Sequence, residues 1–561
     1  MSGETLVYSD DEVAAAAAPA TGLSRSHFAV VASASLGTLF EWYDFYLYGT
    51  LAALIGAKFF SALDPSRAFV FALVTFATGS LMRPVGAALF GRLGDKLGRK
   101  KTFLATILVM GLSTATVGLM PTYKDIGIAA PIALVLLRVG QGLAAGGEYG
   151  GAVIYVAEHA PRHRRALYTS FINAMSTMGL VLCLGVVLSC RYAFGAHFDD
   201  YGWRAPFLIS VILLAISVYV RLRLEESPVF REMRAEGGVS KSPIRDSFGD
   251  WGNFKLILKT LFGGVVGGGV IYYCGAFYSL FFLTQVLKVE PVTANLLVTA
   301  GLVAGAPFHI VFGWLCDRIG RKPVFLTGCV LAALLIFPIY RTMADFANPA
   351  LGRAATAQPV QVLADQSHCP IRFDPLGLAP YARPCDIAKS VPAQAGVPYA
   401  NVDAKIGDAA VIRIGATEIK APSGTGLSGA AFTQAKADFK AAVLKAFVAA
   451  GYPAAPADHV NGLGVAAMVF LMMIFTTLTT APLAIWMVEL FPARVRYTSM
   501  SVPYHVGTGL FGGFLPTIMF ALVFATGNIF SGLWYPLLCT IVTILVCAAA
   551  LPETRNLRTL K

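Results

Sequence analysis

The chain has few charged residues for its length. Only 14% of its 561 residues are Asp, Glu, Lys or Arg, whereas soluble domains carry about 25%. Hydrophobic residues make up 56% of the chain. This shortage of charge excludes an ordinary soluble protein and favours many helices inside a lipid bilayer.

Motifs for catalysis and for ATP-driven work are also missing. The sequence has no G-x-x-x-x-G-K-[ST] loop, which disfavours ATP-driven pumping. It has no serine in a G-x-S-x-G turn, the signature of many hydrolases. Its cysteines and histidines form no cluster with metal-ligand spacing, so we expect no metal. We therefore expect a protein that is not an enzyme.

Apolar windows long enough to span a bilayer occur throughout the chain. A spanning helix needs about 20 mostly apolar residues. Two sets of six windows flank a charged, non-periodic gap from Glu225 to Lys255. They lie near residues 28–56, 68–90, 102–121, 130–156, 166–191, 204–223, 259–285, 293–315, 323–341, 463–488, 498–525 and 531–551. The sequence predicts an all-α membrane protein with twelve transmembrane helices in two six-helix bundles.

Basic residues in the short loops predict the orientation. Loops around Lys96, Arg164 and Arg494 are rich in Lys and Arg, and the loops between them are not. Cytoplasmic loops carry this excess, so we expect the inner (plasma) membrane with both termini cytoplasmic. The loops also explain the net charge of +12 without nucleic acid as a partner. The expected division is a disordered cytosolic tail over 1–25, an N-terminal bundle over 26–224, a cytosolic linker over 225–258, a C-terminal bundle over 259–341 and 462–555, and a periplasmic insert over 342–461.

One motif occurs twice, at matching places in the two bundles. Residues 91–100 read GRLGDKLGRK and residues 313–322 read GWLCDRIGRK. A carboxylate here can meet the positive end of a neighbouring helix, and the arginines can pair with nearby acids. The alternative is that the basic residues only set topology. The candidate gating residues are Gly91, Asp95, Gly98, Arg99, Gly313, Asp317, Gly320 and Arg321.

The insert interrupts the second repeat with about 109 extra residues. Residues 411–420 have the pattern of a short hairpin, and Phe439, Val443 and Phe447 recur at helical spacing. A loop of this length with its own periodicity favours a small domain over a tether. Cys369 and Cys385 are its two cysteines, and an oxidising exterior favours a disulfide between them.

Together these motifs resemble the major facilitator superfamily. The repeated frame is its loop signature, and Arg138-x-x-x-Gly142 resembles its helix-4 signature. Within it, FEWYDF (residues 40–45) and GGEYGG (residues 146–151) are similar to the metabolite:H⁺ symporter family, which includes α-ketoglutarate, citrate, shikimate and proline/betaine carriers. The resemblance implies alternating access between two bundles, a latch role for the repeated motif and a proton as the coupling ion, with no other cofactor.

Charged residues deep in the helices are the candidates for proton coupling, because burying a charge in a bilayer is costly. Counting about 1.5 Å per residue from the inner ends places Asp44 near 24 Å and Arg138 near 28 Å. Arg83 and Glu148 fall near 10 and 13 Å. The depths predict two pairs, Asp44/Glu41 with Arg138 and Arg83 with Glu148. Asp44 or Glu41 would then carry the proton, or the pairs would only fix helix packing.

Polar and aromatic residues inside the expected helices, most of them in the second half, suggest a cavity for a polar solute. The candidates are Tyr43, Gln141, Tyr272, Tyr273, Tyr278, Trp486, Tyr504 and His505. We expect a monomeric, proton-coupled symporter of a small polar metabolite. An organic acid is the first choice, because Arg83 and Arg138 supply positive charge. The alternatives are a betaine or proline symporter and a transporter-like receptor that uses the insert.

Overall fold

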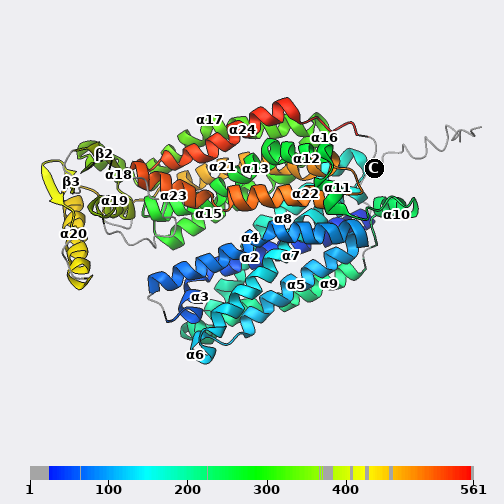
Figure 1. Cartoon of the computed structure of the whole chain (residues 1–561), viewed down its shortest axis with the longest axis horizontal. Coiled ribbons are helices and arrows are strands. Elements are labelled where there is room, and N and C mark those ends of the chain that lie inside the picture. The colour runs from blue at the N-terminus through cyan, green and yellow to red at the C-terminus, as the bar shows by residue number, and fades with distance from the viewer. Residues whose placement is uncertain are drawn as a thin grey trace, which may run out of the picture.

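The computed structural model describes residues 25–62, 65–223, 225–365, 367, 369, 383–404, 409–423, 429–453 and 459–557. The expected tail over 1–25 lies outside this range except for Arg25. Most of the chain forms long helices that run along one common axis, and the short elements of the insert gather at one end (Figure 1).

Ten helical segments of the described chain are long and apolar enough to cross a membrane, by length and composition alone. They are Arg99–Leu119, Ala129–His159, Arg162–Gly202, Arg204–Leu222, Trp251–Val286, Pro291–Ile319, Arg321–Ala347, Gly462–Leu490, Arg496–Thr526 and Ser531–Ala550. Two further long helices, α2 (Arg25–Thr50) and α4 (Pro65–Leu97), precede them. Both contain interior charges, at Glu41, Asp44 and Arg83.

The helices form two halves of similar make-up (Figure 1). The N-terminal half contains α2, α4, α5 (Arg99–Leu119), α7 (Ala129–His159), α8 (Arg165–Phe194) and α9 (Arg204–Leu222), with short helices α3 (Ala52–Phe59) and α6 (Tyr123–Ile126). The C-terminal half contains α12 (Trp251–Thr260), α13 (Val266–Tyr273), α14 (Ser279–Phe281), α15 (Pro291–Gly305), α16 (Phe308–Ile319), α17 (Arg321–Ala347), α21 (Gly462–Leu490), α22 (Arg496–Val506), α23 (Leu515–Thr526) and α24 (Trp534–Ala550).

The segment expected as a linker, 225–258, is more ordered than its sequence pattern predicts. It contains α10 (Pro228–Ala235) and α11 (Pro243–Phe248). The next helix, α12, begins at Trp251, before the expected bundle boundary. Its start is explained by Asp250, whose side chain accepts a hydrogen bond from the backbone N–H of Gly252 at 3.0 Å and so caps the helix.

The insert is a small α/β unit of α18 (Pro349–Ala357), β1 (Val360–Ala364), α19 (Pro384–Ala395), β2 (Tyr399–Asp403), β3 (Ala410–Ile414), β4 (Thr417–Lys420) and α20 (Gly429–Ala449). The strand order is β2-β1-β3-β4, with β1 parallel to β2 and antiparallel to β3. Strands β3 and β4 form a hairpin over the residues where the sequence predicts one. Alternate residues of β1 and β3 are buried, because one face of the sheet packs on helices.

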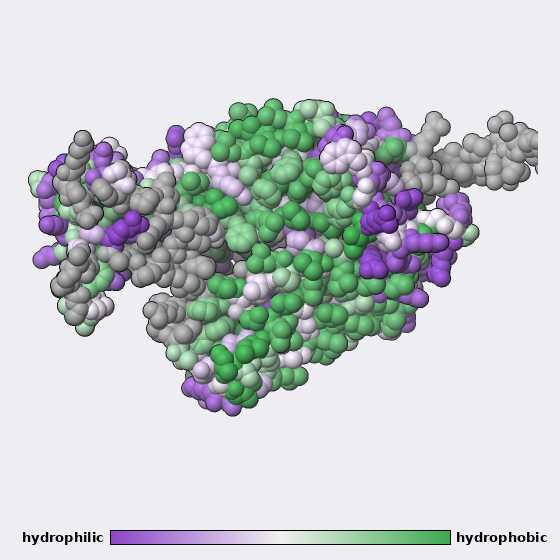
Figure 2. Space-filling view, viewed as in Figure 1, coloured by the Kyte–Doolittle hydropathy of each residue, from purple (hydrophilic) through white to green (hydrophobic). Residues whose placement is uncertain are grey.

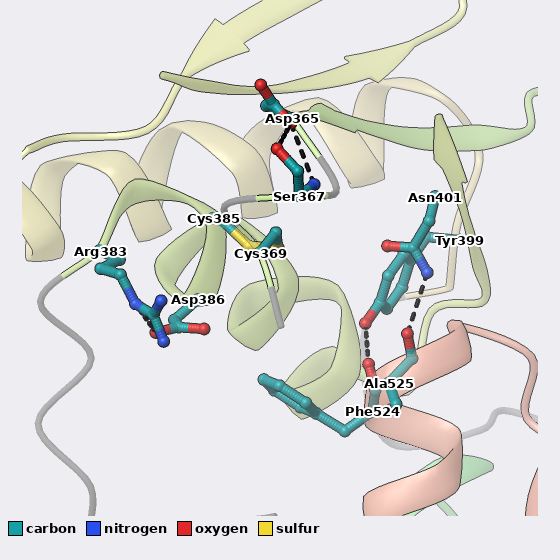
Figure 3. Close-up of a disulfide and its surroundings, with 10 residues drawn as sticks. All are labelled: Asp365, Ser367, Cys369, Arg383, Cys385, Asp386, Tyr399, Asn401, Phe524 and Ala525. Carbon is teal, nitrogen blue, oxygen red and sulfur yellow. Dashed lines mark hydrogen bonds and ion pairs between the residues drawn. A yellow bond between two sulfur atoms is a disulfide. The ribbon is translucent and has the colours of Figure 1, made fainter. Parts of the chain in front are cut away.

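The insert is tied to the C-terminal half by its own hydrogen bonds. A disulfide joins Cys369 to Cys385, which lies in the first turn of α19 (Figure 3). The Tyr399 hydroxyl donates to the carbonyl of Phe524, and Asn401 Nδ2 donates to the carbonyl of Ala525 at 3.0 Å. Both acceptors lie at the C-terminal end of α23 (Figure 3), so the insert is fixed to that end of the helix.

Surface polarity follows this arrangement. Hydrophobic residues cover the middle of the molecule, and hydrophilic residues gather at its two ends (Figure 2). The end that holds Asp95 and Asp317 is called the latch end below, and the opposite end is the insert end. A wide apolar zone between two polar ends is what a bilayer requires.

Close helix contact in the N-terminal half depends on glycine. A Cβ atom added at Gly142 of α7 would lie 2.1 Å from the carbonyl oxygen of Gly79 on α4. A Cβ added at Gly146 would lie 2.2 Å from the carbonyl oxygen of Arg83. Backbone atoms cannot move aside as a flexible side chain does, so these glycines set the distance between α4 and α7.

We expect Gly142→Ala to lower the free energy of unfolding by about 1–3 kcal/mol through overpacking. Thermal unfolding of the purified protein in detergent measures the effect. Gly140→Ala on the same helix is the matched control, because its Cβ would meet only the Ser113 hydroxyl at 3.3 Å. Equal unfolding temperatures for the two variants would contradict this account of the α4–α7 contact.

Candidate functional site

A buried polar network surrounds Asp44 in the N-terminal half. Asp44 Oδ1 accepts hydrogen bonds from Thr114 Oγ1 at 2.8 Å and Gln141 Nε2 at 3.2 Å. Its other oxygen lies 3.7 Å from Arg138 Nη1, and Arg138 donates to Gln141 Oε1 at 2.6 Å. The structure thus brings Asp44 and Arg138 together, as their matched depths predict. Gln141 belongs to this network and bridges the pair.

Glu41 lies one turn from Asp44 on α2 and has a different partner. Its Oε1 lies 3.7 Å from Arg83 Nη1, so Glu41 pairs with α4 and not with Arg138. Three residues of separation place Glu41 and Asp44 on neighbouring parts of one helix face. Both pairs line one small cavity inside the N-terminal half, which makes them a single electrostatic unit.

Glu148 does not pair with Arg83, and this part of the sequence prediction is wrong. Its carboxylate pairs with Arg221 of α9 and accepts a hydrogen bond from Thr106 Oγ1 at 2.8 Å. The reason is angular. Gly146 faces the backbone of Arg83, and Glu148, two residues later, points about 200° away around α7.

Arg221 was missed because it lies at the very end of its apolar window, where an arginine reads as a loop charge. Its guanidinium is buried, stacks over the Phe103 ring at 3.5 Å and donates to the Phe103 carbonyl at 2.8 Å. A Cβ at Gly37 would overlap the Arg221–Glu148 pair. The glycine of α2 therefore makes room for this ion pair.

A second cavity lies between the two halves, and Glu41 and Arg83 line this one too. Four of the sequence-predicted cavity residues line it: Tyr272, Tyr273, Tyr504 and His505. Residues that the prediction missed include Thr38, Trp42, Tyr149 and Asn173. Trp42 lies within FEWYDF and Tyr149 within GGEYGG, so position inside these motifs was the available signal.

Four predicted cavity residues lie elsewhere: Gln141 belongs to the Asp44 network, and the other three pack inside their own halves. Tyr43 is buried inside the N-terminal half and donates to the carbonyl of Pro206 at 2.7 Å. Tyr278 is buried against Tyr340 and Phe520. Trp486 donates through Nε1 to the carbonyl of Pro552 at 3.0 Å. These three side chains do not reach the central cavity because each points to the side of its helix that packs inside its own half.

Aromatic rings close the central cavity on the side towards the insert end. Tyr46 and Tyr272 share a hydrogen bond at 3.2 Å between their hydroxyls, and Tyr46 stacks on Phe277 at 6.1 Å. Trp42 contacts Tyr272 edge-on at 5.7 Å. The rings of Tyr149 and Tyr504, which also line the cavity, stack with their centroids 4.1 Å apart. Each contact joins the N-terminal half to the C-terminal half, so the ring pairs form layers across the interface.

Asp95 binds the start of a helix in the other half. It accepts hydrogen bonds from the backbone N–H groups of Tyr497 at 3.2 Å and Thr498 at 3.0 Å, and from Thr498 Oγ1 at 2.8 Å. These are the first residues of α22, where unpaired N–H groups and the helix dipole favour an anion. A Cβ at Gly91 would approach Thr498 to 2.9 Å, so this glycine permits the contact.

Asp317 makes the reciprocal contact. It accepts from the backbone N–H groups of Ala166 at 3.1 Å and Leu167 at 2.9 Å, at the start of α8. A Cβ at Gly313 would lie 2.5 Å from Ser170 Oγ. Each half therefore holds the other by a carboxylate on a helix N-terminus.

The arginines of the repeated motif organise the acids around these contacts. Arg99 donates to the Ala493 carbonyl of the other half at 2.9 Å and lies 3.8 Å from Glu158. Arg321 donates to both oxygens of Glu489, at 3.0 and 2.9 Å. Glu158 also pairs with Arg496 at 2.9 Å across the interface.

Gly98 and Gly320 have φ values of 109° and 112°, a backbone conformation that favours glycine. They let the chain turn into α5 and α17. The first residue of each helix then has a free backbone N–H group. That of Arg99 donates a hydrogen bond to Glu226 at 2.9 Å, and that of Arg321 donates to Glu553 at 3.0 Å. Phe230 of α10 covers the Arg99 guanidinium at 4.8 Å, so the linker completes the latch.

A family model described as Major Facilitator Superfamily matches residues 34–348, more than half of the chain. The chain belongs to the major facilitator superfamily. Membership assigns it to a family of multi-pass membrane transporters and not of enzymes. The fold agrees. A solved structure of the proton:xylose symporter XylE bound to 6-bromo-6-deoxy-D-glucose superposes with a TM-score of 0.61 at 16% identity, covering 94% of this chain and 96% of that chain.

Two proteins similar in sequence are named as transporters of proline and betaine or of related compounds. The proline/betaine transporter of Escherichia coli (strain K12) is 39% identical over 320 residues, 55% of this chain and 63% of that protein. The glycine betaine/proline/ectoine/pipecolic acid transporter OusA of Dickeya dadantii is 36% identical over 323 residues, again 55% and 63%. The chain therefore spans less than two thirds of the length of these relatives.

For the latch we expect Asp95→Ala to open the latch end. Hydrogen bonds to a carboxylate are worth about 1.5–3 kcal/mol each, so the open state should gain at least about tenfold in population. Spin labels replace the exposed residues Lys101 and Arg318, one on each half. The distance between the two labels, measured by double electron–electron resonance, should be longer in the variant than in the wild type. Asp125→Ala, an exposed helix cap at the insert end, is the control. An unchanged distance in the Asp95 variant would contradict the latch.

The pairing of Glu148 makes a second prediction. Glu148→Gln and Arg221→Gln should each destabilise the protein by about 3–5 kcal/mol, because each leaves a buried charge unpaired. The double variant should cost clearly less than the sum. Glu148→Gln combined with Arg83→Gln should be additive to within about 0.5 kcal/mol. Unfolding in detergent measures these four variants and Arg83→Gln alone, and coupling to Arg83 in place of Arg221 would refute the assignment.

Proposed function

We propose that the chain is a proton-coupled symporter of small zwitterionic metabolites, such as proline and betaines. It works by alternating access in the inner membrane, as a monomer with both termini cytoplasmic. The names of the similar transporters support this substrate class. They favour the alternative of the sequence analysis over its first choice, an organic acid.

The charge of the central cavity is the observation that carries the proposal. Among the described residues that line it, one carboxylate, Glu41, accompanies one guanidinium, Arg83. The lining is therefore formally neutral. A dicarboxylate needs surplus positive charge, but Arg83 is paired with Glu41 and Arg138 with Asp44. A zwitterion supplies one charge of each sign and matches the pair without leaving a net buried charge.

The aromatic lining suits the cationic end of such a substrate. Trp42, Tyr272 and Tyr273 lie on one side, and Tyr149 and Tyr504 lie beneath. Aromatic faces attract quaternary ammonium groups, which cannot donate hydrogen bonds. Glu41 supplies an acceptor for substrates that carry N–H groups. One cavity can therefore hold both a betaine and an imino acid.

Asp44 is the proposed proton carrier. It is buried, and its Oδ2 lies 3.7 Å from Arg138, beyond hydrogen-bond length. Protonation of Asp44 would remove the attraction and free Arg138 to turn towards Gln141, which already accepts from it. Because Glu41 and Arg83 line both cavities, a change at Asp44 reaches the substrate through one pair of side chains.

Uptake into proteoliposomes tests the proposal. The protein should accumulate labelled proline or glycine betaine when the outside is acidic, and succinate should neither be taken up nor compete. Asp44→Asn should abolish accumulation against a gradient but retain exchange of internal for external substrate. The reason is that the amide keeps the Thr114 and Gln141 contacts and cannot carry a proton.

Asp125→Asn is the control for this variant, since it makes the same change at an exposed helix cap that lines neither cavity. An Asp44→Asn protein that still concentrates substrate would contradict the proton assignment. Binding of betaine without flux at any pH gradient would favour the receptor alternative, in which the insert senses the ligand.

A further inference from the structure

His505 of α22 is buried at the central cavity, and both of its ring nitrogens lack a hydrogen-bond partner among the described residues. Its side chain is 1% exposed and lines the cavity between the halves. A buried polar group that lacks a partner costs about 1–3 kcal/mol, and native structures keep such groups only for a reason.

The surroundings of His505 indicate what it binds. Its neighbours are the Arg83 guanidinium and the Gly146 backbone carbonyl, which lies near the ring but outside hydrogen-bond geometry. The Tyr504 ring holds it edge-on at 5.0 Å. Glu41 lines the same cavity, and its Oε2 is also without a hydrogen-bond partner among the described residues. The cavity thus offers an unused donor beside a cation, and an unused acceptor on the facing carboxylate.

We propose that His505 and Arg83, one from each half, bind the carboxylate of a small zwitterion whose cationic group faces Glu41. The assignment rests on the proposed function and names the recognition element: an amino- or ammonium-substituted carboxylate, with the two charges one carbon apart. In either neutral tautomer the imidazole has one N–H to donate. Arg83 contributes N–H groups, because its 3.7 Å contact with Glu41 is longer than a hydrogen bond.

The position of His505 on α22 links this recognition to the latch. Thr498, which Asp95 holds through the backbone and side chain, lies seven residues earlier on the same helix. Seven residues are two turns, about 10.5 Å along one face. A carboxylate bound between Arg83 and His505 therefore joins α4 to α22 two turns from the point where Asp95 of α4 already joins them.

The cavity contains a matched control. His309 of α16 lines the same cavity and is also buried. Its Nδ1 lies 3.2 Å from the Ala306 carbonyl of its own segment, so the ring has a local partner. A histidine-to-phenylalanine change at either position keeps a flat ring and removes the nitrogens. Only at position 505 should the loss reach the substrate.

The experiment compares the wild type, His505→Phe, His505→Asn, His505→Gln and His309→Phe in proteoliposomes. For proline and glycine betaine, His505→Phe should raise KM about 10- to 100-fold, the loss of one hydrogen bond to a charged group, with kcat changed less than about threefold. Asn or Gln, which restores a donor, should recover most of the KM. His309→Phe should stay within about threefold of the wild type.

Selectivity separates recognition from a structural role. Choline lacks the carboxylate of glycine betaine, and pyrrolidine lacks that of proline. The wild type should prefer each carboxylate over its analogue in competition assays, and His505→Phe should lose most of this preference. A variant that is merely less stable would keep the ratio. Gel filtration and thermal unfolding in detergent identify any variant that fails to fold.

The outcomes distinguish the two proposals. If the wild type transports neither zwitterion, the proposed function is wrong. If the wild type transports them and KM and selectivity of a folded His505→Phe protein are unchanged, the function stands and the role of His505 is wrong. If His505→Phe does not fold, His505→Leu, which also lacks a donor, takes its place: a raised KM with lost selectivity supports the role, and unchanged values overturn it.

Discussion

A charge buried among membrane helices has to be paired, and this constraint shapes the N-terminal half. Asp44, Glu41 and Glu148 each face a different arginine, from α7, α4 and α9. The pairs fix which helix faces which, because an acid without its arginine would destabilise the whole bundle. Glycines then let the helices come close enough for the pairs to form, as at Gly37 beside Arg221 and Glu148.

At the latch end two acids are also paired, but their partners in the opposite half are backbone N–H groups and not arginine side chains. Asp95 and Asp317 each bind the N-terminus of a helix in the opposite half. A helix N-terminus carries about half a positive charge, enough to hold a carboxylate and weak enough to release it. The copies differ in their second acid: Glu158 pairs with Arg496 across the interface, whereas Glu489 pairs with Arg321 inside its own half. The two halves are therefore not equivalent gates.

The contacts also define a conformation. The latch end is held by Asp95, Asp317 and the Glu158–Arg496 pair, and aromatic layers cross the interface above the central cavity. Between these two barriers, Glu41 and Arg83 connect the cavity to the Asp44 network. In the proposed alternating access one barrier opens at a time, and a ligand that bridges α4 and α22 would act on the barrier at the latch.

What the sequence alone determined were features with a one-dimensional signal: apolar length for the helices, a repeated motif for the latch, and two cysteines in a polar insert for the disulfide. Matched depth also found the Asp44–Arg138 pair. Depth along the helix is only one coordinate, however. The direction in which a side chain points around the helix can be assigned only when the neighbouring helices are known. The sequence alone therefore pairs Glu148 with Arg83, and it predicts for Tyr43, Tyr278 and Trp486 a cavity that they do not reach. Tertiary structure decided those directions, since two residues along a helix turn a side chain to the opposite face.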